Sequence, residues 1–154
     1  MNGNLDKKNG FLYAKAAVAA LCGAFTAAFG WLGWLVLAWA ACMALDWLSG
    51  SAAAASKGEW ASAVARAGIW HKLGMIITVC VAALTDAVLS IAVANLPILG
   101  LTYETLVLPV VLVWYIFTEL GSIAENAAAL GAPVPESLLK LLAVGKGAAE
   151  NRKD

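Results

Sequence analysis

Charged side chains are scarce in this chain, and histidine is almost absent. The 154 residues include 10 Lys or Arg, 10 Asp or Glu and 1 His, whereas 62% are hydrophobic. Soluble domains carry charge on about a quarter of their residues, so this composition excludes an ordinary water-soluble protein. The formal net charge is zero, which gives no reason to expect nucleic acid as a partner.

The groups that most enzymes and metal sites require are also missing. His71 is the only histidine, and no HExxH, Cys/His or Ser-His-Asp pattern surrounds it. Cys22, Cys42 and Cys80 lie in apolar segments without CxxC spacing, as small packing residues do. We therefore expect no catalytic residue, no metal and no cofactor, and the sequence predicts that the chain is not an enzyme.

Long apolar segments dominate instead. Ala16 to Leu45 contains no charged residue and would be about 45 Å long as one straight helix, longer than the roughly 30 Å hydrocarbon core of a bilayer. Gly30-Trp31 and Gly33-Trp34 form the natural break, because glycine frees the backbone and tryptophan prefers the membrane interface. The fold class predicted is an all-α, integral membrane helical bundle.

This bundle is expected to have four transmembrane helices, with three as the alternative. The predicted spans are about 11–29, 31–55, 72–94 and 103–130. Residues 1–132 would form the transmembrane domain, and 133–154 a short cytoplasmic amphipathic helix and tail, with the tail starting near Gly145.

Helix ends are predicted from proline, glycine and capping residues. Asn95-Leu96-Pro97 should end the third span, because proline lacks an N–H and disfavours helical angles at the residue before it. Thr102 is a plausible N-cap for the fourth span, and Gly131 should terminate it. Pro135 would then start the amphipathic helix.

The distribution of basic residues predicts the orientation. They occur in three groups: Lys7, Lys8 and Lys15; Lys57, Arg66 and Lys72; and Lys140, Lys146, Arg152 and Lys153. Residues 95–103 contain none. Because Lys and Arg favour the cytoplasmic side, four spans would put all three groups in the cytoplasm of a bacterium, whereas three spans would separate the first from the others.

Small residues recur every four positions in the first apolar segment. Ala16, Ala20, Ala24 and Ala28 form one such series, and Gly23 belongs to a second. A helix face of this kind lets another backbone approach closely. The partner is either another helix of the same chain or a second copy, and the spacing fits both interpretations.

Three carboxyl groups lie in otherwise apolar sequence: Asp46, Asp86 and Glu119. A charge at mid-membrane costs about 2.5–3.5 kcal/mol on insertion scales. We expect no Lys or Arg deep enough in the spans to pair with them. They are predicted to line a water-filled lesion or to sense the state of the membrane, and the alternative is that they form internal hydrogen bonds that hold the helices together.

The last predicted span carries a polar stripe. Glu119, Ser122, Glu125 and Asn126 follow helical spacing and fall on one side. Such a face should contact protein or water rather than lipid, and we count these residues among the lesion-lining candidates.

Several segments together resemble the toxin-secretion and phage-lysis holin family. The sequence from Asp46 to Gly50 is similar to an early family signature that includes Ser49, and the sequence from Gly68 to Leu73, with Lys72, is similar to a basic entry into the next span. Most specific is Glu119-Leu-Gly-Ser-Ile-Ala-Glu-Asn126. It is followed by Gly131, Pro133 and Pro135, which match the family's ending.

The resemblance implies a protein of the bacterial cytoplasmic membrane that forms homo-oligomers and opens a lesion in the lipid bilayer. A murein hydrolase (endolysin), or a secreted toxin in toxin loci, would then leave the cell. Two alternatives from other classes remain open at this point: a small proton- or ion-coupled transporter, and a structural subunit of a membrane complex.

Overall fold

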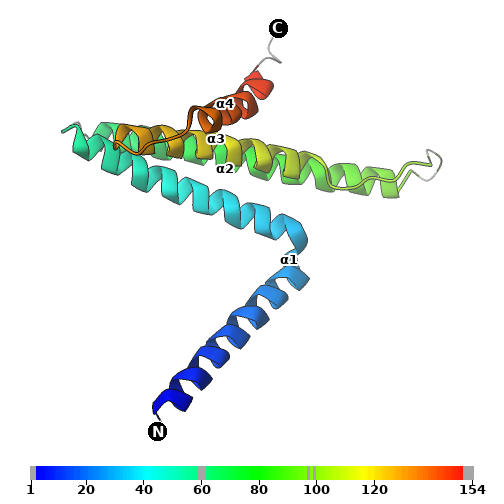
Figure 1. Ribbon diagram of the computed structural model, residues 1–154. Helices are drawn as coiled ribbons and strands as arrows, with labels where there is room; N and C mark the ends of the chain where they lie inside the picture. Colours follow the sequence, from blue (N-terminus) through cyan, green and yellow to red (C-terminus); the bar gives the residue numbers. More distant parts are fainter. Residues whose placement is uncertain (1–2, 59–61, 97, 99, 151–154) are drawn as a thin grey trace. The chain divides into compact units, whose positions relative to one another are not determined.

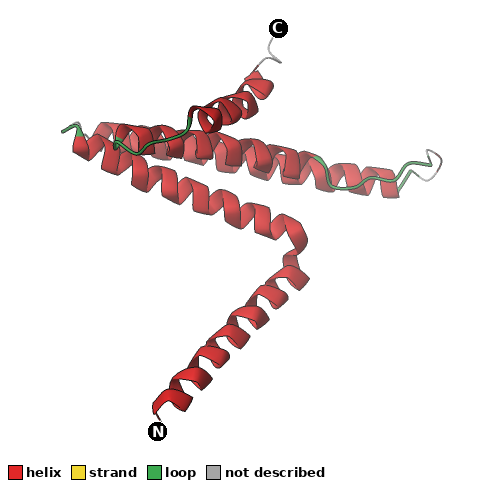
Figure 2. Ribbon diagram, in the orientation of Figure 1, coloured by secondary structure: helices red, strands yellow, loops and turns green. Residues whose placement is uncertain are grey.

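The computed structural model describes residues 3–58, 62–96, 98 and 100–150, and in this part of the chain helices are joined by loops without any strand (Figure 2). The helices are α1 (Gly3–Ser56), α2 (Ser62–Ala94), α3 (Val107–Ala129) and α4 (Glu136–Glu150) (Figure 1). The first three are long and apolar enough to cross a membrane. The prediction of an all-α, multi-pass membrane protein with a short C-terminal helix is confirmed.

The chain divides into two compact units, Met1–Val36 and Leu37–Asp154, so that α1 contributes to both. In the first unit α1 is interrupted at Gly30, whose φ of 60° and ψ of −158° are not helical. The predicted break is therefore confirmed, and Gly30 is suited to it because a left-handed φ is strained for other residues.

Aromatic contacts hold the chain across this break. The ring of Phe25 lies 5.1 Å from that of Trp34, measured between centroids, and the Trp34 indole donates a 2.9 Å hydrogen bond to Thr26 Oγ1. Gly33 is required here, because a Cβ at that position would lie 2.5 Å from the Cβ of Phe29. Both glycines of the predicted break thus have a structural reason.

Most of the first unit's side chains are exposed. All members of the small-residue series, Ala16, Ala20, Gly23, Ala24 and Ala28, are among them. Large apolar residues such as Phe11 and Leu21 are exposed as well. This surface requires lipid or protein around it.

The second unit is a bundle of the C-terminal part of α1 with α2 and α3. Buried and half-buried positions on each helix repeat every three or four residues, the spacing of one packed helix face. They include Trp39, Cys42, Asp46, Ser49 and Ala53; Lys72, Met75, Val79, Ala82 and Asp86; and Leu112, Glu119 and Asn126. The polar residues of the membrane segments thus share faces with the apolar core.

The starts of two helices differ from the starts of the predicted spans. α2 begins at Ser62 and so extends ahead of the span predicted from about residue 72; its first turns are rich in alanine, a strong helix former. α3 begins at Val107 rather than 103, and Thr102 is not its cap. α2 ends at Ala94, as expected from Asn95-Leu96-Pro97, although Pro97 itself lies outside the described residues.

The C-terminal end of α3 matches the prediction. Gly131 has φ 89°, and the N–H of Ala132 reaches back to Ala127 O at 3.0 Å, the closing pattern of a Schellman motif. α4 follows, packs on α3 and buries Leu142. It continues to Glu150, past the expected start of the tail; residues 151–154 are outside the described part.

Candidate functional site

The three carboxyl groups of the apolar segments lie in two separate clusters within the second unit. Asp46 and Glu119 share one lysine, Lys72, and Ser49 and Asn126 complete this group, which we call the Lys72 cluster. Asp86 lies at the start of α3, where it binds Tyr103 and backbone N–H groups; we call this arrangement the Asp86 cap.

Lys72 is the centre of the first cluster. Its ammonium nitrogen lies 3.0 Å from Asp46 Oδ2 and 2.7 Å from Glu119 Oε2. The three residues come from α1, α2 and α3 respectively, so one side chain ties together all three helices of the bundle.

Asn126 extends the cluster along α3. Its amide nitrogen donates to Asp46 Oδ1 and to Ser49 Oγ, both at 3.1 Å. Gly50 lies against this amide, because a Cβ there would be in van der Waals contact with the Asn126 amide nitrogen at 3.4 Å. The polar groups of α1 and α3 are therefore in direct contact.

The cluster is largely withdrawn from the surface. The side chain of Glu119 is 4% exposed, that of Lys72 18% and that of Asp46 22%. One ammonium faces two carboxyl groups, so the cluster carries a net charge of −1 when all three groups are ionised. An isolated charge in hydrocarbon costs about 2.5–3.5 kcal/mol on insertion scales, and mutual pairing reduces this cost.

The expectation that no basic residue pairs with these carboxyl groups is wrong for Asp46 and Glu119. That expectation placed Lys72 at the start of its membrane span. Because α2 begins at Ser62, Lys72 lies inside the helix, on the same face as the buried Met75 and Asp86. The spacing of these three residues was the signal that could have placed Lys72 in the core.

Asp86 has a different set of partners. It accepts a hydrogen bond from the Tyr103 hydroxyl and from the backbone N–H groups of Leu106, Val107 and Leu108, the latter at 3.1, 2.9 and 2.7 Å. The fourth N–H at this helix end does not exist, because the next residue is Pro109. Asp86 thus satisfies all the free donors at the N-terminus of α3, the role predicted for Thr102.

The contact also affects Tyr103, which lies outside the membrane-spanning segments. The hydrogen bond to Asp86 raises the pKa of the Tyr103 phenol above its ordinary value of about 10. Tyr103 was not singled out from the sequence, since an aromatic residue between two helices carries no distinctive pattern.

The four residues of the predicted polar stripe do not act together. Glu119 and Asn126 belong to the Lys72 cluster. Ser122 instead donates to Thr118 O in its own helix, at 3.2 Å, and Glu125 is exposed. Glu119 and Asn126 thus face α1 and α2, Ser122 is half-buried and lines a groove between α2 and α3, and only Glu125 of the four is exposed.

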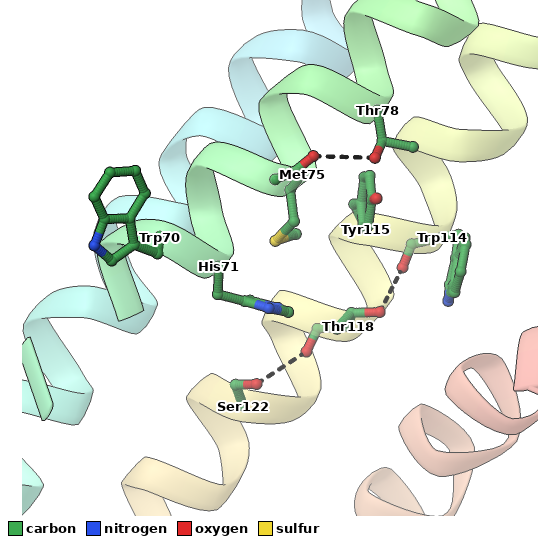
Figure 3. A pocket seen from close by; sticks show the side chains of 9 residues that line it. Trp70, His71, Met75, Thr78, Trp114, Tyr115, Thr118 and Ser122 are labelled. Carbon is green, nitrogen blue, oxygen red and sulfur yellow. Dashed lines mark hydrogen bonds between the residues drawn. The ribbon is translucent and has the colours of Figure 1, made fainter. Parts of the chain in front are cut away.

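A groove of about 690 Å³ lies beside the cluster, between α2 and α3. Figure 3 shows side chains from both helices around it, among them His71, Met75, Trp114 and Thr118. The hydroxyls of Thr78, Thr118 and Ser122 bind carbonyl oxygens of their own helices. Among the described residues, no group of three or more His, Cys, Asp or Glu side chains could hold a metal ion.

Three sequence segments that carried the family resemblance meet in the Lys72 cluster: Asp46 to Gly50, Gly68 to Leu73, and Glu119 to Asn126. The model of the bacteriophage holin family matches residues 23–146. The chain belongs to the bacteriophage holin family. The family's closing segment coincides with the end of α3 at Gly131 and the link through Pro133 and Pro135 to α4.

The chain is also similar to an uncharacterized protein from Halalkalibacterium halodurans. The two are 33% identical over 132 residues, which cover 86% of this chain and 87% of the relative. No solved structure is similar to the holin at a significant level.

Proposed function

We propose that this holin self-associates in the bacterial cytoplasmic membrane and opens lesions through which a murein hydrolase, or another large protein such as a toxin, leaves the cell. The convergence of the family's motif segments on the Lys72 cluster supports this function most directly. Polar residues that are shared between three apolar helices mark a functional site in a membrane protein by default.

Self-association follows from the size of the bundle. Three packed helices have their core filled by side chains such as Met75 and Leu112 and leave no channel for a folded protein. Passage of such a cargo requires several copies. The exposed small-residue face of the first unit, with Ala20, Gly23 and Ala24, is suited to close packing between copies.

The proposed topology follows from the basic residues. The link between α1 and α2, with Lys57, and helix α4, with Lys140, would lie in the cytoplasm, and the loop from residue 95 to 106 outside. With a break at Gly30, α1 would cross twice, giving four spans in a domain of residues 1–132 and a cytoplasmic segment of 133–154.

Expression in a bacterium tests the proposal. The holin is induced with and without a murein hydrolase that lacks a secretion signal, while membrane potential and viability are followed. We expect sudden depolarisation in both cultures and lysis only with the hydrolase. A saturable, solute-specific flux without killing would favour a transporter, and normal growth at confirmed membrane levels would favour a structural subunit.

A further inference from the structure

The Lys72 cluster joins three helices through side chains alone. Lys72, Asp46 and Glu119 come from different helices, and each loses its ionic partner if the helices separate. Asn126 adds a link between α1 and α3 through Asp46 and Ser49. The cluster therefore stabilises one particular arrangement of the bundle.

These groups have two favourable surroundings. Inside the closed bundle they pair with one another, and beside a water-filled lesion they would be hydrated. Lipid offers the charged groups neither an ionic partner nor water. An intermediate arrangement, in which the helices have separated but the charges contact lipid, is therefore disfavoured. An element with two discrete favourable states is what a switch requires.

The charge balance limits the stability of the closed state. Lys72 faces two carboxyl groups, so when both are ionised one negative charge in the cluster has no cation of its own. Water around an opened lesion would relieve the repulsion between Asp46 and Glu119. The excess carboxylate thus favours opening, whereas Lys72 favours closure.

We propose that the Lys72 cluster is a latch that holds α1, α2 and α3 together in the closed holin and sets the time at which the lesion opens. This inference rests on the proposed lesion-forming function. The latch predicts that removal of the lysine and removal of a carboxylate shift the timing in opposite directions. A role of these residues as lesion lining alone predicts a delay in both cases.

The first experiment measures the time of lysis at matched membrane levels, with the hydrolase present. Lys72→Met should bring lysis forward, because it leaves two carboxylates without a cation. Glu119→Gln should delay lysis, because Lys72 and Asp46 then form a balanced pair and the amide oxygen still accepts a hydrogen bond. Lys72→Arg, which preserves the charge, should restore timing close to that of the native chain.

Lys140→Met is the matched control. Lys140 pairs with Glu136 at 3.6 Å on the exposed side of α4, where both side chains are well solvated. Its replacement also removes one positive charge but should leave the lysis time unchanged. If Lys72→Met delayed lysis or left its time unchanged, the latch would be ruled out.

A second experiment does not depend on the folding of the charge variants. In a full chain with its three cysteines replaced by alanine, Ser49→Cys and Asn126→Cys are joined by a short thiol cross-linker that dithiothreitol releases. Purified protein is added to phospholipid vesicles that contain a fluorescent dye. The linked chain should lose dye release, and dithiothreitol should restore it.

The same double-cysteine chain without the cross-linker is the reference for release. A chain with Ser90→Cys alone, at an exposed position on α2, is treated with the cross-linker as the control and should release dye throughout. Release from the linked chain equal to that of this control would overturn the latch while leaving lesion formation intact. Absence of lysis and of dye release with the native chain would instead overturn the proposed function, and the latch with it.

Discussion

Two sites in the bundle hold carboxylates in different ways. At the start of α3, Asp86 binds three backbone N–H groups and the hydroxyl of Tyr103. Farther inside the helices, Asp46 and Glu119 depend on the side chains of Lys72 and Asn126. Both arrangements avoid an unpaired charge in an apolar setting. They differ in the effect that losing their hydrogen bonds or ion pairs would have on the protein.

Backbone donors at a helix end are fixed in position by the helix itself, so the Asp86 cap belongs to the folded structure of α2 and α3. The partners in the Lys72 cluster are side chains on three separate helices, and none of them caps a helix end. We therefore expect the Asp86 cap to persist when a lesion forms and the Lys72 cluster to rearrange. Substitutions in the Asp86 cap should therefore change mainly the stability of the fold, whereas substitutions in the Lys72 cluster should change mainly the time of lysis.

The largest effect on stability is expected at the cap. Asp86→Ala removes the acceptor for four hydrogen bonds and leaves the α3 donors unsatisfied in an apolar region, which should lower the free energy of unfolding by about 3 kcal/mol. Unfolding in mixed detergent micelles, followed by circular dichroism, measures this change. Ser90→Ala, at an exposed position on the same helix, is the control; equal stability of the two variants would show that the cap is not structural.

A smaller effect is expected in the cluster. Asn126→Ala removes the hydrogen bonds to Asp46 and Ser49 and should lower the unfolding free energy by about 1–2 kcal/mol. Ser122→Ala, in the same stripe, loses only a bond to its own helix and should change stability by less than about 0.5 kcal/mol. A larger loss at Ser122 than at Asn126 would contradict the importance of the hydrogen bonds between α1 and α3.

The smallest effect concerns the titration of Tyr103. A phenol whose folded pKa lies above the unfolded value contributes stability that is complete below the unfolded pKa, about 10, and is lost as pH rises through the folded pKa. We expect the phenolate absorbance of Tyr103, obtained as the difference from Tyr103→Phe, to appear at lower pH in Asp86→Asn. An unchanged midpoint would show that Asp86 does not bind the hydroxyl.

Much of this architecture could be predicted because it follows from local chemistry. Glycine at positions 30 and 131 provides backbone angles that other residues avoid, so the break in α1 and the end of α3 were predictable. The membrane-spanning helices were predictable from the length of the apolar segments compared with the thickness of a bilayer. Helix α4 was predictable from Pro135 and its leucine pattern.

The partners of the carboxylates could not be predicted, because they depend on contacts between distant parts of the chain. Lys72 and Glu119 are 47 positions apart. The cap of α3 comes from Asp86 of α2 rather than from the residues just before α3. The local sequence pattern, which indicated Thr102, could therefore not reveal it. The apolar sequence around the three carboxylates was enough to single them out, but it did not identify their partners.

The most direct test of the central claim is the escape of a folded protein from sealed vesicles. Vesicles of bacterial phospholipids are loaded with a fluorescent protein and a small dye, and the purified holin is added in increasing amounts. The account predicts that both contents are released together, abruptly, above a threshold number of chains per vesicle. Retention of the fluorescent protein at every holin level, whether or not ions or dye escape, would contradict it.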